Sequence, residues 1–337
     1  MAPLMTVEGL RVEASSASGR IVAVDELDLE IAPGEAVGII GESGSGKTTT
    51  VRSLIDLLER NVEITAGSIT FQGEKHYGPG VNRLHRIRGR HVGMIFQSAL
   101  NSLNPLLRVG TQLREVLKVH RPDLSDDEKQ SRMQEVLRRM EFPDPDRVLK
   151  AYPHQLSGGM RQRAAIALAI VTEPELVIAD ECTSALDVTT QAEVMELLRG
   201  LAEDRGTALL FVTHDLLLAA EVCDRIVVMY GGAVVETGVV EQVLREPRHP
   251  YTQALLRSVP TWGPPRPLAG IEGTPPKVTP GTVGCRFAAR CAYTVDACRE
   301  RDVPLFAPGD GHDVRCLLPD GVPVPDSLRD RMVSPHA

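Results

Sequence analysis

One stretch of eight residues combines glycines, a lysine and a threonine at a spacing that could hold a phosphate group. It starts at Gly41 and reads GESGSGKT, which fits the pattern G-x-x-x-x-G-K-[S/T] at every fixed position. Gly44 and Gly46 let the backbone bend so that successive N–H groups face one anion. Lys47 can reach the outer phosphates of a nucleotide, and the Thr48 hydroxyl can ligate Mg²⁺. The stretch predicts a nucleoside triphosphate site, with a glycine-rich turn that matches by chance as the alternative.

The residues on either side of this stretch help to decide between these alternatives. Residues 35–40 are short and apolar and follow Pro33 and Gly34, as expected of a buried strand. Residues 49–58 carry apolar side chains at helical spacing and so predict a helix. Strand, glycine loop and helix thus come in the order that a phosphate-binding loop requires, which favours nucleotide binding.

Polar side chains that could do chemistry end further apolar strands. Gln97 ends a predicted strand over residues 91–96, where by itself it would favour an ordinary loop residue. Asp180 and Glu181 end the apolar run LVIA. One such carboxylate can bind Mg²⁺ while the other orients or deprotonates a water molecule. His214 follows another apolar strand. A lone His at such a position is usually structural, but the presence of polar residues at several other strand ends favours a functional role.

A second candidate for anion binding precedes a strongly helical run at residues 164–170. Ser157, Gly158 and Gly159 are small enough to let the free N–H groups of a helix start approach a phosphate closely. An ordinary helix N-cap is the alternative for the same residues.

The remaining pattern predicts further strands and helices. Residues 5–31 alternate polar and apolar side chains and predict short antiparallel strands joined by a turn. A further strand is predicted at residues 68–72. Residues 109–140 have helical periodicity, and within them Ser125 and Glu128 predict a capping box, because each side chain can satisfy the backbone N–H of the other residue.

Composition limits the classes of protein to which the chain can belong. At about 150 residues per domain, its 337 residues make one large or two modest domains. The net charge of -8 and the pI near 5.7 argue against an extended nucleic-acid surface. The first residues lack the pattern of a signal peptide, and the longest apolar run, residues 164–171, is far shorter than the ~20 residues of a membrane span. We expect a cytosolic protein, or one attached to a membrane through other chains.

Taken together, these segments resemble the motifs of the ATP-binding subunit of an ABC transporter, in the same order and at similar spacing. The matching segments are Walker A (GESGSGKT, 41–48), the Q-loop (Gln97), the signature (LSGGMRQR, 156–163), Walker B (LVIADE, 176–181), the D-loop (SALD, 184–187) and the H-loop (His214). The resemblance implies a P-loop NTPase with a RecA-like α/β core, an N-terminal antiparallel sheet and a helical signature subdomain near residues 98–165. It also implies a head-to-tail dimer with two ATP molecules between the subunits.

The resemblance assigns roles to particular residues. Catalysis would fall to Gln97, Glu181 and His214. Mg²⁺ would be held by Thr48, Gln97 and Asp180. The nucleotide would be contacted by two groups of residues, the second of which reaches the ATP of the partner subunit: Gly41, Glu42, Ser43, Gly44, Ser45, Gly46, Lys47, Thr48 and Thr49, and Ser157, Gly158 and Gly159.

A finer resemblance is to the dipeptide/oligopeptide importer branch, with nickel importers as close relatives. It is carried by Met94–Gln97, Asn101–Pro105, Pro153–Gln155, His249–Thr252, Leu255, Leu256 and Pro260. It implies a motor that couples ATP hydrolysis to peptide uptake at the cytoplasmic face of the membrane. Its partners would be two permease subunits, a second ATPase subunit and an extracytoplasmic peptide-binding protein, with no nucleic acid. A soluble ABC ATPase acting on DNA or ribosomes is the alternative from another class, and the acidic pI stands against it.

The C-terminal part is rich in Pro and Gly from Pro260 onward, as in an extended connector, and holds four of the six cysteines. They are Cys285, Cys291, Cys298 and Cys316. A disulfide framework is not expected in a reducing cytosol. Five, six and seventeen residues separate the four, which is not the C-x₂-C spacing of zinc ribbons. A segment with so little apolar material would gain fold stability from a bound metal.

These cysteines resemble the C-terminal extension of peptide-importer ATPases, where an iron–sulfur cluster is implied. We hypothesise a [4Fe–4S] site held by all four, with zinc and unligated thiols as alternatives. The predicted domains are an ABC ATPase domain over residues 5–258 and a connector with the four-cysteine extension over residues 259–337.

Two positions depart from the family pattern. Residues 12–15, where such subunits usually place an aromatic side chain under the adenine, contain Ala14 and no Phe, Tyr or Trp. Cys182 stands where the family commonly has proline after the catalytic glutamate, and we expect it to be tolerated.

The missing aromatic side chain predicts weak discrimination between ATP and GTP. Stacking of a base on an aromatic ring is worth on the order of 1–3 kcal/mol in nucleic-acid binders. Without it we expect the dissociation constants for ATP and GTP to differ by less than about tenfold, or about 1.4 kcal/mol. Equilibrium binding of both nucleotides measures the difference, and an Ala14→Tyr variant that lost affinity equally for both would contradict the prediction.

Overall fold

The structure of the chain, a computed structural model, describes residues 2–17, 19–97, 102–184, 186–258 and 270–318. Several predicted features fall partly outside this range: residues 98–101 at the start of the helical subdomain, Ala185 of the D-loop, residues 259–269 of the connector and residues 319–337 of the C-terminal extension. The chain forms two compact units. The first comprises residues 1–31, 37–82 and 212–337, and the second comprises residues 32–36 and 83–211.

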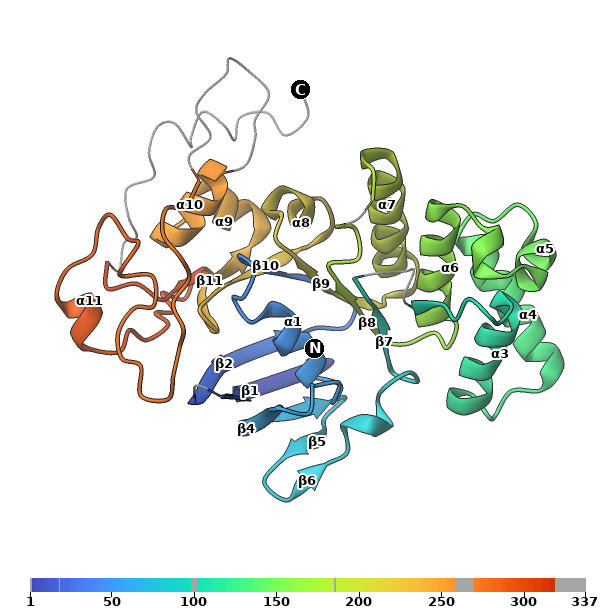
Figure 1. Ribbon diagram of the computed structural model, residues 1–337, viewed down its shortest axis with the longest axis horizontal. Helices are drawn as coiled ribbons and strands as arrows, with labels where there is room; N and C mark the ends of the chain where they lie inside the picture. The colour runs from blue at the N-terminus through green and yellow to red at the C-terminus, as the bar shows by residue number, and fades with distance from the viewer. Residues whose placement is uncertain (1, 18, 98–101, 185, 259–269, 319–337) are drawn as a thin grey trace, which may run out of the picture. The chain divides into compact units, whose positions relative to one another are not determined.

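An antiparallel sheet begins the first unit (blue in Figure 1). Its strands, in spatial order, are β2 (Gly19–Ile31), β1 (Met5–Ser16), β4 (Val62–Phe71), β5 (Glu74–Gly78) and β6 (Val81–Asn82). The antiparallel pairing of β1 with β2 confirms the strands predicted over residues 5–31. β4 starts earlier than the predicted residues 68–72. Its first five residues, VEITA, alternate apolar and polar side chains, but none of its first six residues is buried.

A second group of strands in this unit includes the strand that precedes the phosphate loop. β3 (Ala36–Ile40) pairs in parallel with β10 (Arg225–Tyr230), and β10 pairs antiparallel with β11 (Ala233–Val239). β12 (Asp313–Val314) adds to the other side of β11. β3 is buried along its whole length, as expected of a parallel strand covered on both faces. The helices of this unit are α1 (Lys47–Ser53), α8 (Leu216–Val222), α9 (Val240–Arg245), α10 (Pro250–Ser258) and α11 (Ala297–Glu300).

The helix after the phosphate loop is shorter than predicted. α1 ends at Ser53, whereas the sequence pattern extends to Leu58. Asp56 has a φ of 55°, a left-handed conformation that a right-handed helix does not contain. Leu54 and Ile55 are nevertheless buried, which explains why the apolar spacing continues beyond the end of the helix.

The second unit combines strands with a helical group. In it β8 (Leu176–Asp180) lies between β7 (Val92–Ile95) and β9 (Ala208–Thr213), and pairs in parallel with β7. The helices that contact one another (green in Figure 1) are α3 (Val109–His120), α4 (Asp126–Arg139), α5 (Pro145–Lys150) and α6 (Gly158–Ile170). The long helix α7 (Val188–Arg205) follows β8. The helical periodicity of residues 109–140 and the capping box at Ser125 are confirmed, as is the mixed α/β class.

Gly93 in β7 has no room for a side chain. A Cβ at this position would lie 2.2 Å from the carbonyl oxygen of Ala169 and 3.2 Å from the ring of Pro174. We expect Gly93→Ala to lower the free energy of unfolding by about 1–3 kcal/mol, because overpacking forces the backbone to shift. Urea unfolding followed by circular dichroism measures the change.

Gly200 in α7 provides the matched control. A Cβ there would meet nothing within 4 Å, and alanine is favoured over glycine inside a helix by roughly 0.5–1 kcal/mol. Gly200→Ala should therefore raise the free energy of unfolding. Equal effects of the two substitutions would show that the close contact at Gly93 has no energetic weight.

Candidate nucleotide-binding site

The phosphate loop joins β3 to α1, and two of its glycines are required for different reasons. Gly46 caps α1 in a left-handed conformation with a φ of 104°, and a Cβ there would lie 2.4 Å from the carbonyl oxygen of Ala23. A Cβ at Gly41 would lie 2.3 Å from the carbonyl oxygen of Met229. Any side chain at either position would therefore displace the loop.

Lys47 lies over the loop that precedes it. Its Nζ donates hydrogen bonds to the carbonyl oxygens of Gly41 at 2.8 Å and Glu42 at 3.0 Å. The side chain is buried, so the ammonium group is held beside the loop backbone. This places a positive charge where the loop itself is built to meet an anion.

Contacts from distant residues hold the loop backbone in place. The N–H of Glu42 donates to the hydroxyl oxygen of Tyr251 at 2.7 Å, and the N–H of Gly232 donates to the carbonyl oxygen of Ser45 at 2.9 Å. Tyr251 is fully buried, and burial raises the pKa of its phenol, so the hydroxyl is protonated at neutral pH. In the sequence, Tyr251 stands out only as part of the segment His249–Thr252 that resembles the importer branch, and nothing there indicates this contact.

In the second unit, Gln97 and Glu181 come together. The Gln97 amide donates to Glu181 Oε2 at 3.1 Å, and Asp180, which ends β8, is buried beside it in the chain. Glu181 has a φ of 45°. A left-handed backbone costs a non-glycine residue about 1 kcal/mol or more. The predicted amide and carboxylate are thus adjacent at the carboxyl ends of β7 and β8.

The loop that follows Glu181 is anchored although it contains Cys182. The buried Gln162 amide donates to the carbonyl oxygen of Cys182 at 2.8 Å, and the Ser184 hydroxyl donates to the carbonyl oxygen of Glu181 at 3.0 Å. Burial raises the pKa of the Cys182 thiol to about 12. Cys182 is therefore an inert packing residue at neutral pH.

The signature residues start helix α6. Ser157 is its N-cap, with its hydroxyl oxygen accepting a hydrogen bond from the N–H of Met160 at 3.2 Å. Ser157 and Gly158 are exposed and Gly159 is half-exposed. The sequence left two alternatives open, an ordinary N-cap and an anion-binding helix N-terminus. They are compatible, because the cap uses the Ser157 side chain while the first turn of α6 faces solvent.

The remaining predicted residue, His214, is exposed at the end of β9. Asp215 after it caps α8, with one carboxylate oxygen accepting from the N–H groups of Leu217 and Leu218. His214 belongs to the same unit as the phosphate loop, whereas Gln97 and Glu181 belong to the other unit.

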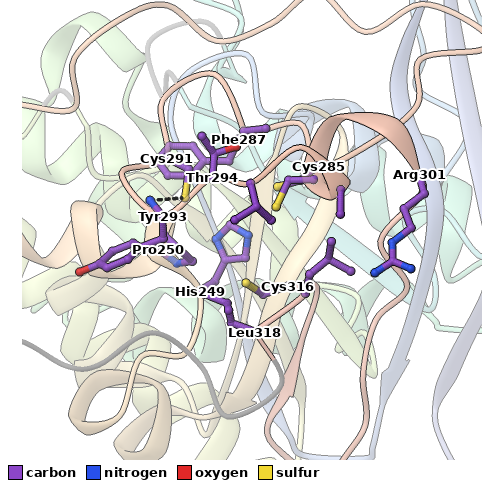
Figure 2. A pocket seen from close by; sticks show the side chains of 15 residues that line it. His249, Pro250, Cys285, Phe287, Cys291, Tyr293, Thr294, Arg301, Cys316 and Leu318 are labelled. Atoms are coloured by element: carbon purple, nitrogen blue, oxygen red, sulfur yellow. Dashed lines mark hydrogen bonds between the residues drawn. The ribbon is translucent and has the colours of Figure 1, made fainter.

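The four C-terminal cysteines line one cavity of about 180 Å³, together with His249 and Phe287 (Figure 2). They are Cys285, Cys291, Cys298 and Cys316. Burial, and after it the neighbouring thiols, raise the pKa of Cys285 to about 11. Within the described residues, no three or more His, Cys, Asp or Glu side chains are grouped so that they could hold a metal ion. Neither the zinc alternative nor the [4Fe–4S] cluster gains support from this arrangement, and the cluster stays a prediction.

These features define the class of protein, an α/β ATPase cassette with a phosphate loop. Residues 24–184 match the ABC transporter family, and residues 235–298 match the C-terminal region of oligopeptide/dipeptide transporters. The chain is 43% identical over 330 residues to a protein of Brucella ovis named as a peptide import ATP-binding protein, covering 94% of this chain and 97% of the relative. A Brucella abortus protein of the same name is 40% identical over 316 residues, covering 94% and 95%. The chain belongs to the ABC transporter family of ATP-binding proteins.

Solved structures agree with this assignment. The ATP-binding cassette MJ0796, in a dimeric post-hydrolysis state bound to ADP and Pi, superposes with a TM-score of 0.61 at 30% identity, covering 70% of this chain and 98% of that chain. The protein cbiO1 from Clostridium perfringens, part of an ABC transporter complex, gives a TM-score of 0.61 at 26% identity, covering 73% and 92%.

Across the part of the chain that the structure describes, no helix is both long enough and apolar enough to cross a membrane.

Proposed function

We propose that the chain is the ATP-hydrolysing motor of an ABC importer for dipeptides or oligopeptides, with nickel or another small solute as the alternative cargo. The observation that carries the proposal is the presence in one chain of the complete set of ATPase motifs and the C-terminal region of oligopeptide/dipeptide transporters. The names of the Brucella relatives support the same cargo.

Binding of ATP would use the phosphate loop and its lysine. Backbone N–H groups of residues 41–49 would surround the phosphates, and Lys47 would exchange its bonds to loop carbonyls for bonds to the outer phosphates. Thr48, Gln97 and Asp180 offer the hard oxygen donors that Mg²⁺ prefers. Mg²⁺ would neutralise charge on the phosphates.

Hydrolysis would depend on the pair at the carboxyl ends of β7 and β8. The Glu181 carboxylate would accept a proton from the attacking water, and the Gln97 amide, which already donates to this carboxylate, would hold it in place. The His214 side chain would form a hydrogen bond near the outer phosphate of the nucleotide.

The signature residues would act on the nucleotide of a second subunit. Ser157, Gly158 and Gly159 leave the first turn of α6 open to solvent, which leaves its N–H groups accessible to a phosphate from another chain. The dimeric state of MJ0796 with ADP and Pi supports such an assembly. We infer a head-to-tail dimer, with a homologous second ATPase subunit as the partner.

The assembled transporter would contain two membrane permease subunits and an extracytoplasmic peptide-binding protein. The ATPase would lie at the cytoplasmic face of the membrane, held there by the permeases. Nucleic acid is not expected as a partner because the chain carries a net charge of -8.

The four-cysteine cavity would hold a [4Fe–4S] cluster. Four thiols that line one cavity supply the ligand set that such clusters use. The bound group would cross-link a segment that has little apolar core.

Substitution of Glu181 tests the hydrolytic role. Glu181→Gln removes the proton acceptor and keeps the shape, so we expect turnover to fall by roughly 10²–10⁴ while ATP still binds. Steady-state phosphate release and ATP binding by the assembled transporter measure the two effects. Glu193→Gln in α7 is the control, because it removes an exposed carboxylate paired with Arg163 and such pairs contribute little. Unchanged turnover in Glu181→Gln would refute the assigned role.

Purification from the native membrane under anaerobic conditions tests the assembly and the cluster together. We expect permeases, a second ATPase and a peptide-binding protein by mass spectrometry, and four iron and four sulfide per chain by analogy with Cys₄ clusters. Absence of membrane proteins, or recovery of nucleic acid in their place, would refute the transport role. Absence of iron and sulfide would refute the cluster and leave the ATPase assignment intact.

A further inference from the structure

The guanidinium of Arg290 is fully used in contacts around the phosphate loop. Nη1 donates to Glu42 Oε2 at 2.7 Å and to the Tyr230 hydroxyl at 3.1 Å, and Nη2 donates to Glu42 Oε1 at 3.2 Å. Nη2 and Nε also donate to the carbonyl oxygens of Ile271 and Glu272, each at 2.7 Å. All five N–H groups therefore have acceptors. Glu42 is the second residue of the loop, 248 positions away in the sequence.

This ion pair differs from an ordinary surface pair. The Arg290 side chain is 5% exposed and that of Glu42 is 26% exposed, so water screens the pair only from one side. The guanidinium also lies over the rings of Tyr230 and Phe287, at 5.7 and 6.0 Å. Bidentate, partly buried pairs of this kind fix geometry as well as energy, and removal of one partner leaves the other charge poorly solvated.

A second connection reaches the same loop residue from the cysteine cavity. Phe287 lines that cavity, and its ring contacts Tyr251 at a centroid distance of 5.4 Å. Tyr251 in turn accepts the hydrogen bond from the Glu42 N–H. The chain around the cavity thus holds Glu42 both by its carboxylate, through Arg290, and by its backbone, through Tyr251.

The position of Arg290 in the chain joins these contacts to the cavity. Cys291, the next residue, faces the cavity, as do Cys285 and Cys298. We call residues 285–298 the cysteine segment. A movement of Cys291 must move the backbone of Arg290, because consecutive residues share a planar peptide bond.

We propose that Arg290 is a positioning residue for ATP at the phosphate loop, through which the cysteine segment sets nucleotide affinity. The proposal rests on the proposed role of the loop in ATP binding. Arg290 holds the Glu42 carboxylate, and so fixes the loop backbone in the shape that presents its N–H groups to phosphate. Because such coupling is reciprocal, ATP binding also stabilises the cysteine segment.

Arg290→Gln tests the coupling in the full-length chain purified under anaerobic conditions. We expect the dissociation constant for ATP to rise about tenfold, within the usual range of coupling between sites. In the assembled transporter, KM for ATP should rise by a similar factor while kcat at saturating ATP stays unchanged, because Arg290 touches no reacting atom. The dissociation constant of Arg290→Lys for ATP should lie between those of the unmodified chain and of Arg290→Gln, since lysine keeps the charge but not the bidentate geometry.

A double-mutant cycle separates positioning from general damage. If Arg290 acts through Glu42, then Glu42→Gln and Arg290→Gln together should weaken ATP binding no more than the stronger single substitution. Additive losses would overturn the proposal. So would an Arg290→Gln chain that binds ATP like the unmodified chain.

Arg121→Gln is the matched control. Arg121 also bonds one carboxylate through two of its nitrogens, with Asp123 as the partner, and it belongs to the other unit, so its substitution lowers stability without changing the contacts of Glu42. An equal loss of ATP affinity in both variants would assign the effect to instability and overturn the proposal. Failure of the unmodified chain to bind ATP would refute the proposed function itself, which is a separate outcome.

Hydrogen exchange tests the reciprocal effect. Addition of ATP should slow amide exchange in residues 285–291 of the unmodified chain. The slowing should be about the factor by which Arg290→Gln raises the dissociation constant for ATP. In Arg290→Gln this slowing should shrink to the part that passes through Phe287 and Tyr251, while residues 46–53 remain protected by saturating ATP. Protection of the cysteine segment that is undiminished by the substitution would overturn the proposal.

Discussion

The close approach of backbone segments around the phosphate loop is the constraint on which the first unit depends. The carbonyl oxygens of Ala23 in β2 and Met229 in β10 lie where a side chain at Gly46 or Gly41 would have to go. Both strands owe their positions to buried apolar side chains, which hold them far more firmly than a few loop hydrogen bonds could. Packing several residues away therefore decides the shape of the loop.

The buried parallel strands separate stability from chemistry. In the second unit, β7 and β8 are apolar along most of their length, and polar residues follow their carboxyl ends. Open α/β sheets generally bind ligands at that edge, because the loops there can vary while the strands stay packed. Glu181 directly follows the buried strand β8. Its left-handed backbone costs conformational energy, and the packing of the strand offsets that cost.

Much of the fold and of the candidate site could be predicted because the signals are local. The capping box at Ser125 needs only four consecutive residues, and alternation over residues 5–31 suffices for two strands. The contacts of Glu42 leave no such signal, because Tyr251 and Arg290 lie 209 and 248 positions away. Arg290 carries no signal in the sequence that links it to the phosphate loop, and only the fold brings it to Glu42.

The short strand β12 lies along the outer edge of β11. It pairs with β11, and the buried pair between His312 and Glu236, at 2.7 Å, fastens it there. An unpaired outer strand offers free N–H and C=O groups that can recruit a strand from another molecule. The C-terminal extension thus supplies an intramolecular partner for the outer edge of β11. In a chain truncated before the extension, this edge would be unpaired and could recruit a strand from another molecule.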